Sequence, residues 1–238
     1  MKESSLPRAG VLITFAACSI LASVDGAASP ERVDHATKSA LELDAHPARG
    51  GEQFRQSCAR CHGSGAQGDA DQAIPALAGQ RFRYLVRQLA DFAGQERESS
   101  IMQRVIAHNT VREPQAWVDI AAYLNGLPVT AHVQTGDGSH AALGRGIFHE
   151  QCASCHRGDA HGDAEGFVPS LRNQHYSYLV TQLDKLAEGS RHNADEDLIL
   201  FWRSLNEQDR RATADYLSRL SGPGEVHKTM RPDGTVVD

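Results

Sequence analysis

The chain has 238 residues, of which 40% are apolar and 23% charged, and its formal net charge is −6. This composition is ordinary for a globular protein, and the acidic balance argues against nucleic acid as a partner, because phosphate binding needs a basic face. Aromatic residues make up only 6%, so two domains of this size would have thin cores unless something else filled them.

The first 28 residues have the pattern of a secretory signal peptide. Lys2 and Arg8 precede an apolar run over residues 9–24, which small residues follow. We therefore predict a signal peptide over residues 1–28 and a periplasmic location. A retained anchor is the first alternative, although the run is shorter than the roughly 20 residues that a membrane span needs. Lipidation at Cys18 is the second.

Helical periodicity is evident at three places in the first half of the chain. Residues 50–61, 81–93 and 114–124 each place apolar side chains at helical spacing, and no convincing alternating strand pattern occurs. Residues 63–80 are rich in Gly, Asp and Pro and predict a long loop, which in a small domain generally wraps around something. The predicted fold class is all-α.

The second half of the chain repeats the first at a distance of 94 residues. Residues 50–89 match residues 144–183 at 18 of 40 positions without a gap. A repeat of this length is a whole domain rather than a solenoid module. We predict two domains, at 46–128 and 141–222, with an N-terminal linker at 29–45, a second linker at 129–140 and a flexible tail at 223–238.

The Cys-x-x-Cys-His motif, the attachment signature of c-type haem, occurs once in each half. Two cysteines about one helical turn apart can form thioethers with the two vinyl groups of a haem, and the adjacent histidine ligates the iron. A zinc ribbon would need the two cysteine pairs to converge, a thioredoxin-like pair would need a βαβ pattern, and a disulfide would not need the histidine. We predict two covalently bound haem c groups, attached at Cys58, Cys61, Cys152 and Cys155 and ligated by His62 and His156.

With these motifs the chain resembles the di-haem cytochrome c-four family, over residues 46–222. The more specific signal is a Pro-x-Leu-x-x-Gln segment followed by Tyr-Leu-x-x-Gln-Leu in each half. The resemblance implies two tandem, helical, class I-like cytochrome c domains. It also implies that the backbone carbonyls of Pro75 and Pro169 accept the Nδ1–H of the motif histidines. Hydrogen bonds to haem propionates are expected from four side chains, for which ordinary packing is the alternative: Gln80, Gln174, Tyr84 and Tyr178.

The sixth iron ligand is where the halves differ. Met102 is the sole methionine between the first haem motif and the last helix of its half, and the resemblance implies that it is the distal ligand. The alternative is a core methionine, with His108 as the ligand.

The corresponding region of the second half has no methionine, and residues 198–200 are Leu-Ile-Leu where the family would place one. His192 is the nearest nitrogen ligand, and Met230 lies in the tail. A bis-His, a Met230-ligated and a five-coordinate iron all remain open.

These features predict an electron carrier between redox proteins, such as a terminal oxidase, a quinol-oxidising complex or a periplasmic dehydrogenase. Peripheral membrane association is left open. One alternative is a cytochrome subunit of a dehydrogenase. Another is an enzyme or sensor that uses an open second haem, although no catalytic side-chain set is recognisable in the sequence.

Overall fold

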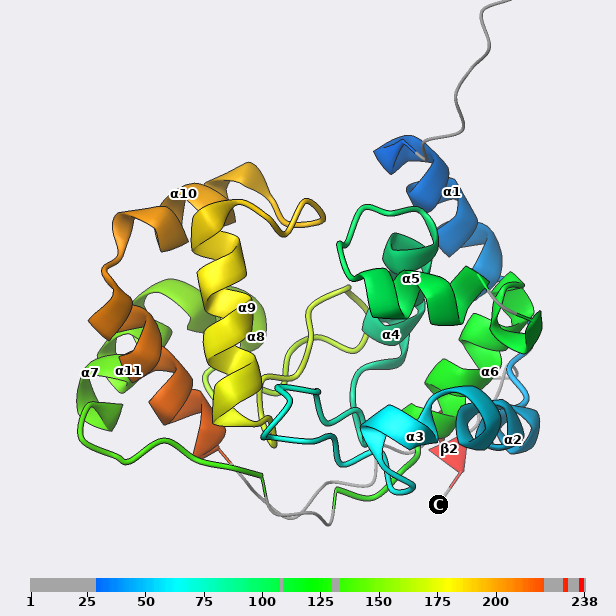
Figure 1. Cartoon of the computed structure of the whole chain (residues 1–238), viewed down its shortest axis with the longest axis horizontal. Coiled ribbons are helices and arrows are strands. Elements are labelled where there is room, and N and C mark those ends of the chain that lie inside the picture. Colours follow the sequence, from blue (N-terminus) through cyan, green and yellow to red (C-terminus); the bar gives the residue numbers. More distant parts are fainter. Residues whose placement is uncertain (1–28, 108, 130–132, 221–228, 231–235, 238) are drawn as a thin grey trace, which may run out of the picture.

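The structure, a computed structural model, describes residues 29–107, 109–129, 133–220, 229–230 and 236–237. The predicted signal peptide and His108 lie outside the described residues. Apart from two short strands, β1 (Thr229–Met230) and β2 (Val236–Val237), every regular element of the described part is a helix. Figure 1 shows the helices in two groups, with long loops between them. The predicted all-α fold is confirmed.

The first domain forms around helices α2, α4 and α6. Its elements are α1 (Pro30–Leu41), α2 (Pro47–Ser57), α3 (Ala59–His62), α4 (Phe82–Ala93), α5 (Ser100–Ala107), the 3-10 turn η1 (Asn109–Val111) and α6 (Pro114–Asn125). Phe54, Val86, Trp117 and Ile120 are buried together in its core. These side chains come from the three segments whose periodicity predicts helices.

Helix α1 occupies the segment for which the sequence predicts a linker. It packs against α4 and α6 and buries Val33, Thr37 and Ala40. These three residues follow helical spacing, but their side chains are small and lie among charged ones, so the apolar periodicity is weak in the sequence. Arg87 of α4 forms an ion pair with Asp34 of α1, which ties the helix to the domain.

The second domain has the same order of α-helices, without a counterpart of α1 among the described residues. It contains α7 (Ala141–Ile147), the π-helical turn η2 (Phe148–Cys152), α8 (Ala153–His156), α9 (Tyr176–Glu188), α10 (Glu196–Ser204) and α11 (Glu207–Ser218). Phe148, Leu179, Trp202 and Leu217 are buried in its core. This core is the smaller of the two.

Helix α2 crosses α6 in the first domain, α7 crosses α11 in the second, and the repeated glycines mark these crossings. A Cβ on Gly50 would lie 1.9 Å from the Asp119 carbonyl oxygen, and one on Gly144 would lie 1.9 Å from the Ala212 carbonyl oxygen. Only glycine allows the backbones of α2 and α6, and of α7 and α11, to approach this closely.

The two domains meet through contacts that recur with the roles of the domains exchanged. Arg97 of the first domain donates to the hydroxyl of Tyr178, and Arg191 of the second domain donates to that of Tyr84. The two arginines are 94 positions apart, and so are the two tyrosines, which is the length of the repeat. The domains are therefore related by an approximate twofold axis.

Candidate haem-binding sites

The two Cys-x-x-Cys-His motifs lie on equivalent short helices, α3 and α8. Cys58 and Cys152 are half-buried, whereas Cys61 and Cys155 are exposed. Burial, with a smaller contribution from the neighbouring cysteine, raises the pKa of Cys58 to about 12 and that of Cys152 to about 11. Each short helical segment therefore presents two cysteine sulfurs next to one histidine.

Each motif histidine is fixed by a proline carbonyl. His62 Nδ1 lies 3.1 Å from the Pro75 carbonyl oxygen, and His156 Nδ1 lies 3.0 Å from that of Pro169. Burial lowers the pKa of both histidines, so the neutral ring is favoured. A neutral imidazole that donates from Nδ1 has its lone pair on Nε2, which is the form that binds a metal.

The loop that carries the proline has the same backbone hydrogen bonds in both domains. Gly68 N donates to the His62 carbonyl at 2.8 Å, and Gly162 N to the His156 carbonyl at 2.9 Å. Both glycines have positive φ, and a Cβ on Gly68 would lie 2.6 Å from the Pro75 carbonyl carbon. The repeated Gly-Asp pair of the sequence thus lets the loop place its proline against the histidine.

The cysteine pairs of the two domains do not form a zinc site. Within the part of the chain that the structure describes, no group of three or more His, Cys, Asp or Glu side chains lies close enough to hold a metal ion. The donor set of each domain is the two cysteine sulfurs and the imidazole of one Cys-x-x-Cys-His motif, and the loop that follows it contributes a half-buried leucine, Leu77 or Leu171, to the apolar core. This set fits a covalently attached haem.

The predicted distal residues occupy different settings in the two domains. Met102 lies on α5, half-buried against the first core, while Ile101 beside it is exposed. In the second domain, Leu198 and Leu200 of α10 are 42% and 51% exposed. The structure therefore offers a thioether on α5 but none on α10.

The nitrogen and sulfur alternatives for the second domain belong to two different segments of the chain. His192 is exposed, in the loop between α9 and α10. Met230 belongs to strand β1 in the C-terminal segment. Ligation of the second iron by either residue stays a prediction.

The four side chains expected near haem propionates all make contacts across the domain boundary. The amide oxygens of Gln80 and Gln174 accept backbone N–H groups of the opposite domain. The hydroxyls of Tyr84 and Tyr178 meet the guanidinium groups described above. A propionate contact stays a prediction for all four residues.

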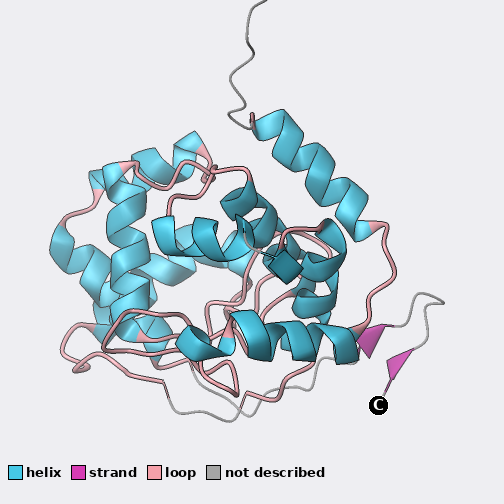
Figure 2. Ribbon diagram, turned by 45° about the vertical axis from the view of Figure 1, so that its right-hand side comes forward, coloured by secondary structure: helices cyan, strands magenta, loops and turns pink. Residues whose placement is uncertain are grey.

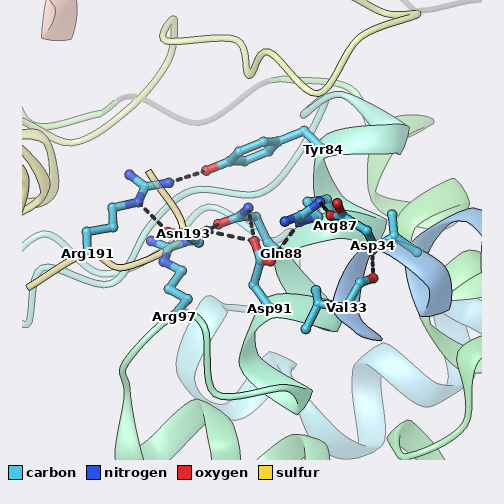
Figure 3. Close-up of polar contacts among 10 residues, drawn as sticks. Val33, Asp34, Tyr84, Arg87, Gln88, Asp91, Arg97, Arg191 and Asn193 are labelled. Carbon is cyan, nitrogen blue, oxygen red and sulfur yellow. Dashed lines mark hydrogen bonds and ion pairs between the residues drawn. The ribbon is translucent and has the colours of Figure 1, made fainter. Parts of the chain in front are cut away.

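Sequence reasoning missed the charged side chains of this boundary, which Figure 3 shows around Asp91. Asp91 is buried, forms an ion pair with Arg87 at 2.7 Å and accepts from Asn193 of the second domain at 2.6 Å. Arg97 and Arg191 are also 94 residues apart, so extending the ungapped repeat beyond residue 89 would have found them.

Comparisons with known proteins agree with this geometry. The family model for cytochrome c matches residues 47–128 and 141–221. The chain belongs to the cytochrome c family. Both matches contain one complete Cys-x-x-Cys-His motif, so this cytochrome carries two covalently bound haem c groups, one in each domain.

Relatives place the cytochrome in the di-haem cytochrome c4-like group. It is 31% identical, over 72% of its length and 82% of the relative, to the thiosulfate dehydrogenase electron acceptor of Stutzerimonas stutzeri. It is 29% identical, over 73% of its length and 88% of the relative, to cytochrome c4 of Pseudomonas aeruginosa. The crystal structure of reduced recombinant cytochrome c4 from Pseudomonas stutzeri superposes with a TM-score of 0.64 at 26% identity, covering 73% of this chain and 98% of that one. The resemblance read from the sequence is confirmed.

Proposed function

We propose that this cytochrome is a periplasmic electron carrier that takes up and releases one electron at each of its two haems, without catalysing a reaction of its own. Haem iron supplies a reversible one-electron change between its ferric and ferrous states. The observation that carries the proposal is the duplicated arrangement of two thiols and a histidine held by a proline carbonyl.

Backbone contacts keep each motif histidine in one orientation. The proline carbonyl fixes the ring plane and the tautomer of its histidine, and a fixed ligand needs little rearrangement when the charge of the iron changes. The reciprocal contacts between the domains hold the two sites in one arrangement. Rapid transfer between two haems benefits from such rigidity.

We infer different potentials for the two haems. A methionine thioether on the distal side raises the potential of a c-type haem. Met102 supports such a ligand in the first domain, whereas α10 of the second domain offers leucine and isoleucine. The first haem is then the one of higher potential.

A periplasmic dehydrogenase is the partner class that we propose as the electron donor. The support is the name of a relative, the thiosulfate dehydrogenase electron acceptor, which aligns over 82% of its own length. An oxidase would then accept the electrons, and a quinol-oxidising complex would be a further donor. No helix among the described residues is long and apolar enough to span a bilayer.

Export rests on the amino-terminal pattern of positive, apolar and small residues. We expect the mature protein to begin near residue 29 and to appear in the periplasmic fraction. Amino-terminal sequencing of the purified protein checks this expectation, and a mature chain that begins at Met1 would contradict it.

A reductive titration tests the carrier function. The purified, full-length protein should take up two electrons per chain and return both to an oxidant, and its mass should include two haems. Mixing with a purified thiosulfate dehydrogenase and thiosulfate should then reduce it, whereas thiosulfate alone should not. Uptake of one electron, or a mass with one haem, would contradict the proposal.

The second candidate function is an enzyme or sensor that uses an open second haem. The lack of a methionine on α10 favours it. Carbon monoxide binding to the reduced second haem, together with peroxide or sulfur turnover by the isolated protein, would support it over the carrier. Carbon monoxide binding without turnover would leave the carrier as the better account.

A further inference from the structure

The peptide group that holds the first motif histidine has two polar ends, and each end faces a different domain. Its carbonyl, on Pro75, lies 3.1 Å from His62 Nδ1 in the first domain. Its N–H, on Ala76, donates to Oε1 of Gln174 in the second domain at 2.9 Å. One peptide plane therefore connects a histidine of one domain to a glutamine of the other.

The second domain contains the same connection with the roles exchanged. The Pro169 carbonyl oxygen lies 3.0 Å from His156 Nδ1, and the N–H of the same peptide group, on Ser170, donates to Oε1 of Gln80 at 2.8 Å. Gln80 and Gln174 are 94 residues apart, which is the repeat length. The connection is thus a feature of the twofold relation rather than a single accidental contact.

Each glutamine is held by a second bond to the same residue. Gln174 Nε2 donates to the Ala76 carbonyl at 3.0 Å, and Gln80 Nε2 donates to the Ser170 carbonyl at 2.9 Å. Gln80 is 9% and Gln174 7% exposed, so water does not compete for these bonds. The amide oxygen is therefore kept on the peptide N–H.

A hydrogen bond to the N–H of a peptide group increases the negative charge on its carbonyl oxygen, because hydrogen bonds in a chain polarise one another. A more negative proline carbonyl attracts the Nδ1–H of the histidine more strongly. The ring then becomes a stronger electron donor to the metal that it ligates. Stronger donation favours the ferric over the ferrous iron and lowers the potential.

We propose that Gln174 and Gln80 are positioning residues that act across the domain boundary, each lowering the potential of the haem in the opposite domain. Gln174 acts on the first haem through the Pro75–Ala76 peptide and His62. Gln80 acts on the second haem through the Pro169–Ser170 peptide and His156. The inference rests on the proposed function, since it takes the two histidines as iron ligands. Docking of the domains thereby sets both potentials together.

The test uses Gln174→Leu in the full-length di-haem protein, because leucine fills much of the same space and forms no hydrogen bond. Both potentials are measured by a redox titration followed by proton NMR, in which each haem is assigned through the thioether protons of its own cysteines. The first haem should shift to a higher potential, and the second haem, in the domain that carries the substitution, should shift less. In Gln80→Leu, the second haem should shift to a higher potential and the first haem should shift less.

A second readout reports on the hydrogen bond itself. In the reduced Gln174→Leu protein, the His62 Nδ1–H resonance should move upfield as its bond to Pro75 weakens, while that of His156 stays in place. Gln174→Glu keeps an oxygen acceptor for the Ala76 N–H and should bring the first potential back to the wild-type value or below it. If the leucine variant does not accumulate haem, Gln174→Glu tests the inference by itself, and the expected change is then a lower potential of the first haem.

Gln182→Leu is the matched control, because Gln182 also accepts across the boundary, from Arg97 at 2.8 Å, without bonding either peptide. It should leave both potentials close to wild type. Equal shifts of both haems in Gln174→Leu, the same shift in Gln182→Leu, or unchanged potentials and Nδ1–H resonances would overturn the inference. Failure of the proposed function would appear differently, as a wild-type protein that lacks two reversible haems.

Discussion

The two domains are nearly the same around the motif histidine and differ in the helix on which we predict the distal ligand. The histidine–proline contacts, the loop bonds to the histidine carbonyls and the glutamine contacts all recur at a distance of 94 residues. In that predicted distal helix the first domain has Met102, on α5, whereas the second has Leu198 and Leu200, on α10. Haem attachment constrains the residues around the histidine in both domains, whereas we expect the predicted distal helix to vary and to give each haem its own potential.

A second difference concerns the size of the two cores. The first domain includes α1, with Val33 and Ala40 buried, and the second has no such helix among the described residues. More buried apolar surface means a larger contribution to stability. The second domain should therefore unfold at a lower denaturant concentration than the first.

Loss of one haem is the largest change that the comparison predicts. Replacing both Cys152 and Cys155 by Ala should remove the haem of the second domain and leave that of the first, because each motif serves its own domain. Mass spectrometry of the denatured protein should show one haem instead of two. Ser154→Ala, between the two cysteines, is the control and should retain both; loss of both haems in the double variant would contradict independent sites.

Substitution of the distal methionine should have the next largest effect. Met102→Ala should remove the thioether-to-ferric-iron absorption band and lower the potential of the first haem, because a soft sulfur ligand favours the ferrous iron. Leu198→Ala, at the corresponding place in the second domain, should leave both the absorption band and the potential of the first haem unchanged. If the band survived in Met102→Ala, Met230 would be the next residue to substitute.

A methyl group added at the helix crossing should destabilise both domains about equally. Gly50→Ala and Gly144→Ala each place a methyl group against a backbone carbonyl, and we expect each to lower the free energy of unfolding of its domain by about 3 kcal/mol. Gly146→Ala is the control, since nothing lies within 4 Å of the added methyl. Denaturant unfolding of the three variants provides the measurement, and equal effects at positions 144 and 146 would show that the close approach is unimportant.

The smallest effect should come from a backbone difference at the end of the motif helix. Gly63 and Arg157 are equivalent, and both have φ and ψ values that are nearly restricted to glycine, with φ of 79° and 65°. Such strain costs about 1–3 kcal/mol for a residue with a side chain. Arg157→Gly should stabilise the second domain by about 1 kcal/mol, after subtracting the higher entropy of glycine in the unfolded chain. Gly63→Ala should destabilise the first domain, and a gain of stability there would contradict this explanation.

Much of the fold could be predicted from the sequence, because its helices carry strong apolar periodicity. Residues 81–93 and 114–124 correspond closely to α4 and α6. Helix α1 was missed, since its buried face consists of small side chains among charged ones.

The contacts between the domains could not be predicted in the same way. Gln80 and Gln174 stand out in the sequence as repeated residues, but their partners lie about 90 or more positions away. Such pairs depend on how the two domains dock, which no local pattern encodes. Repetition shows that a residue matters in both halves without showing what it contacts.

The central claim is that the two haems share one proximal arrangement but differ in their distal ligand, and proton NMR of the reduced wild-type protein tests it most directly. A methionine bound to ferrous haem iron gives its methyl group a strongly upfield-shifted resonance, because the methyl lies over the haem ring. We predict that the protein, with its two haems, gives one such methyl resonance and that this resonance is lost in Met102→Ala. Two upfield methyl resonances in the wild-type protein would contradict the account.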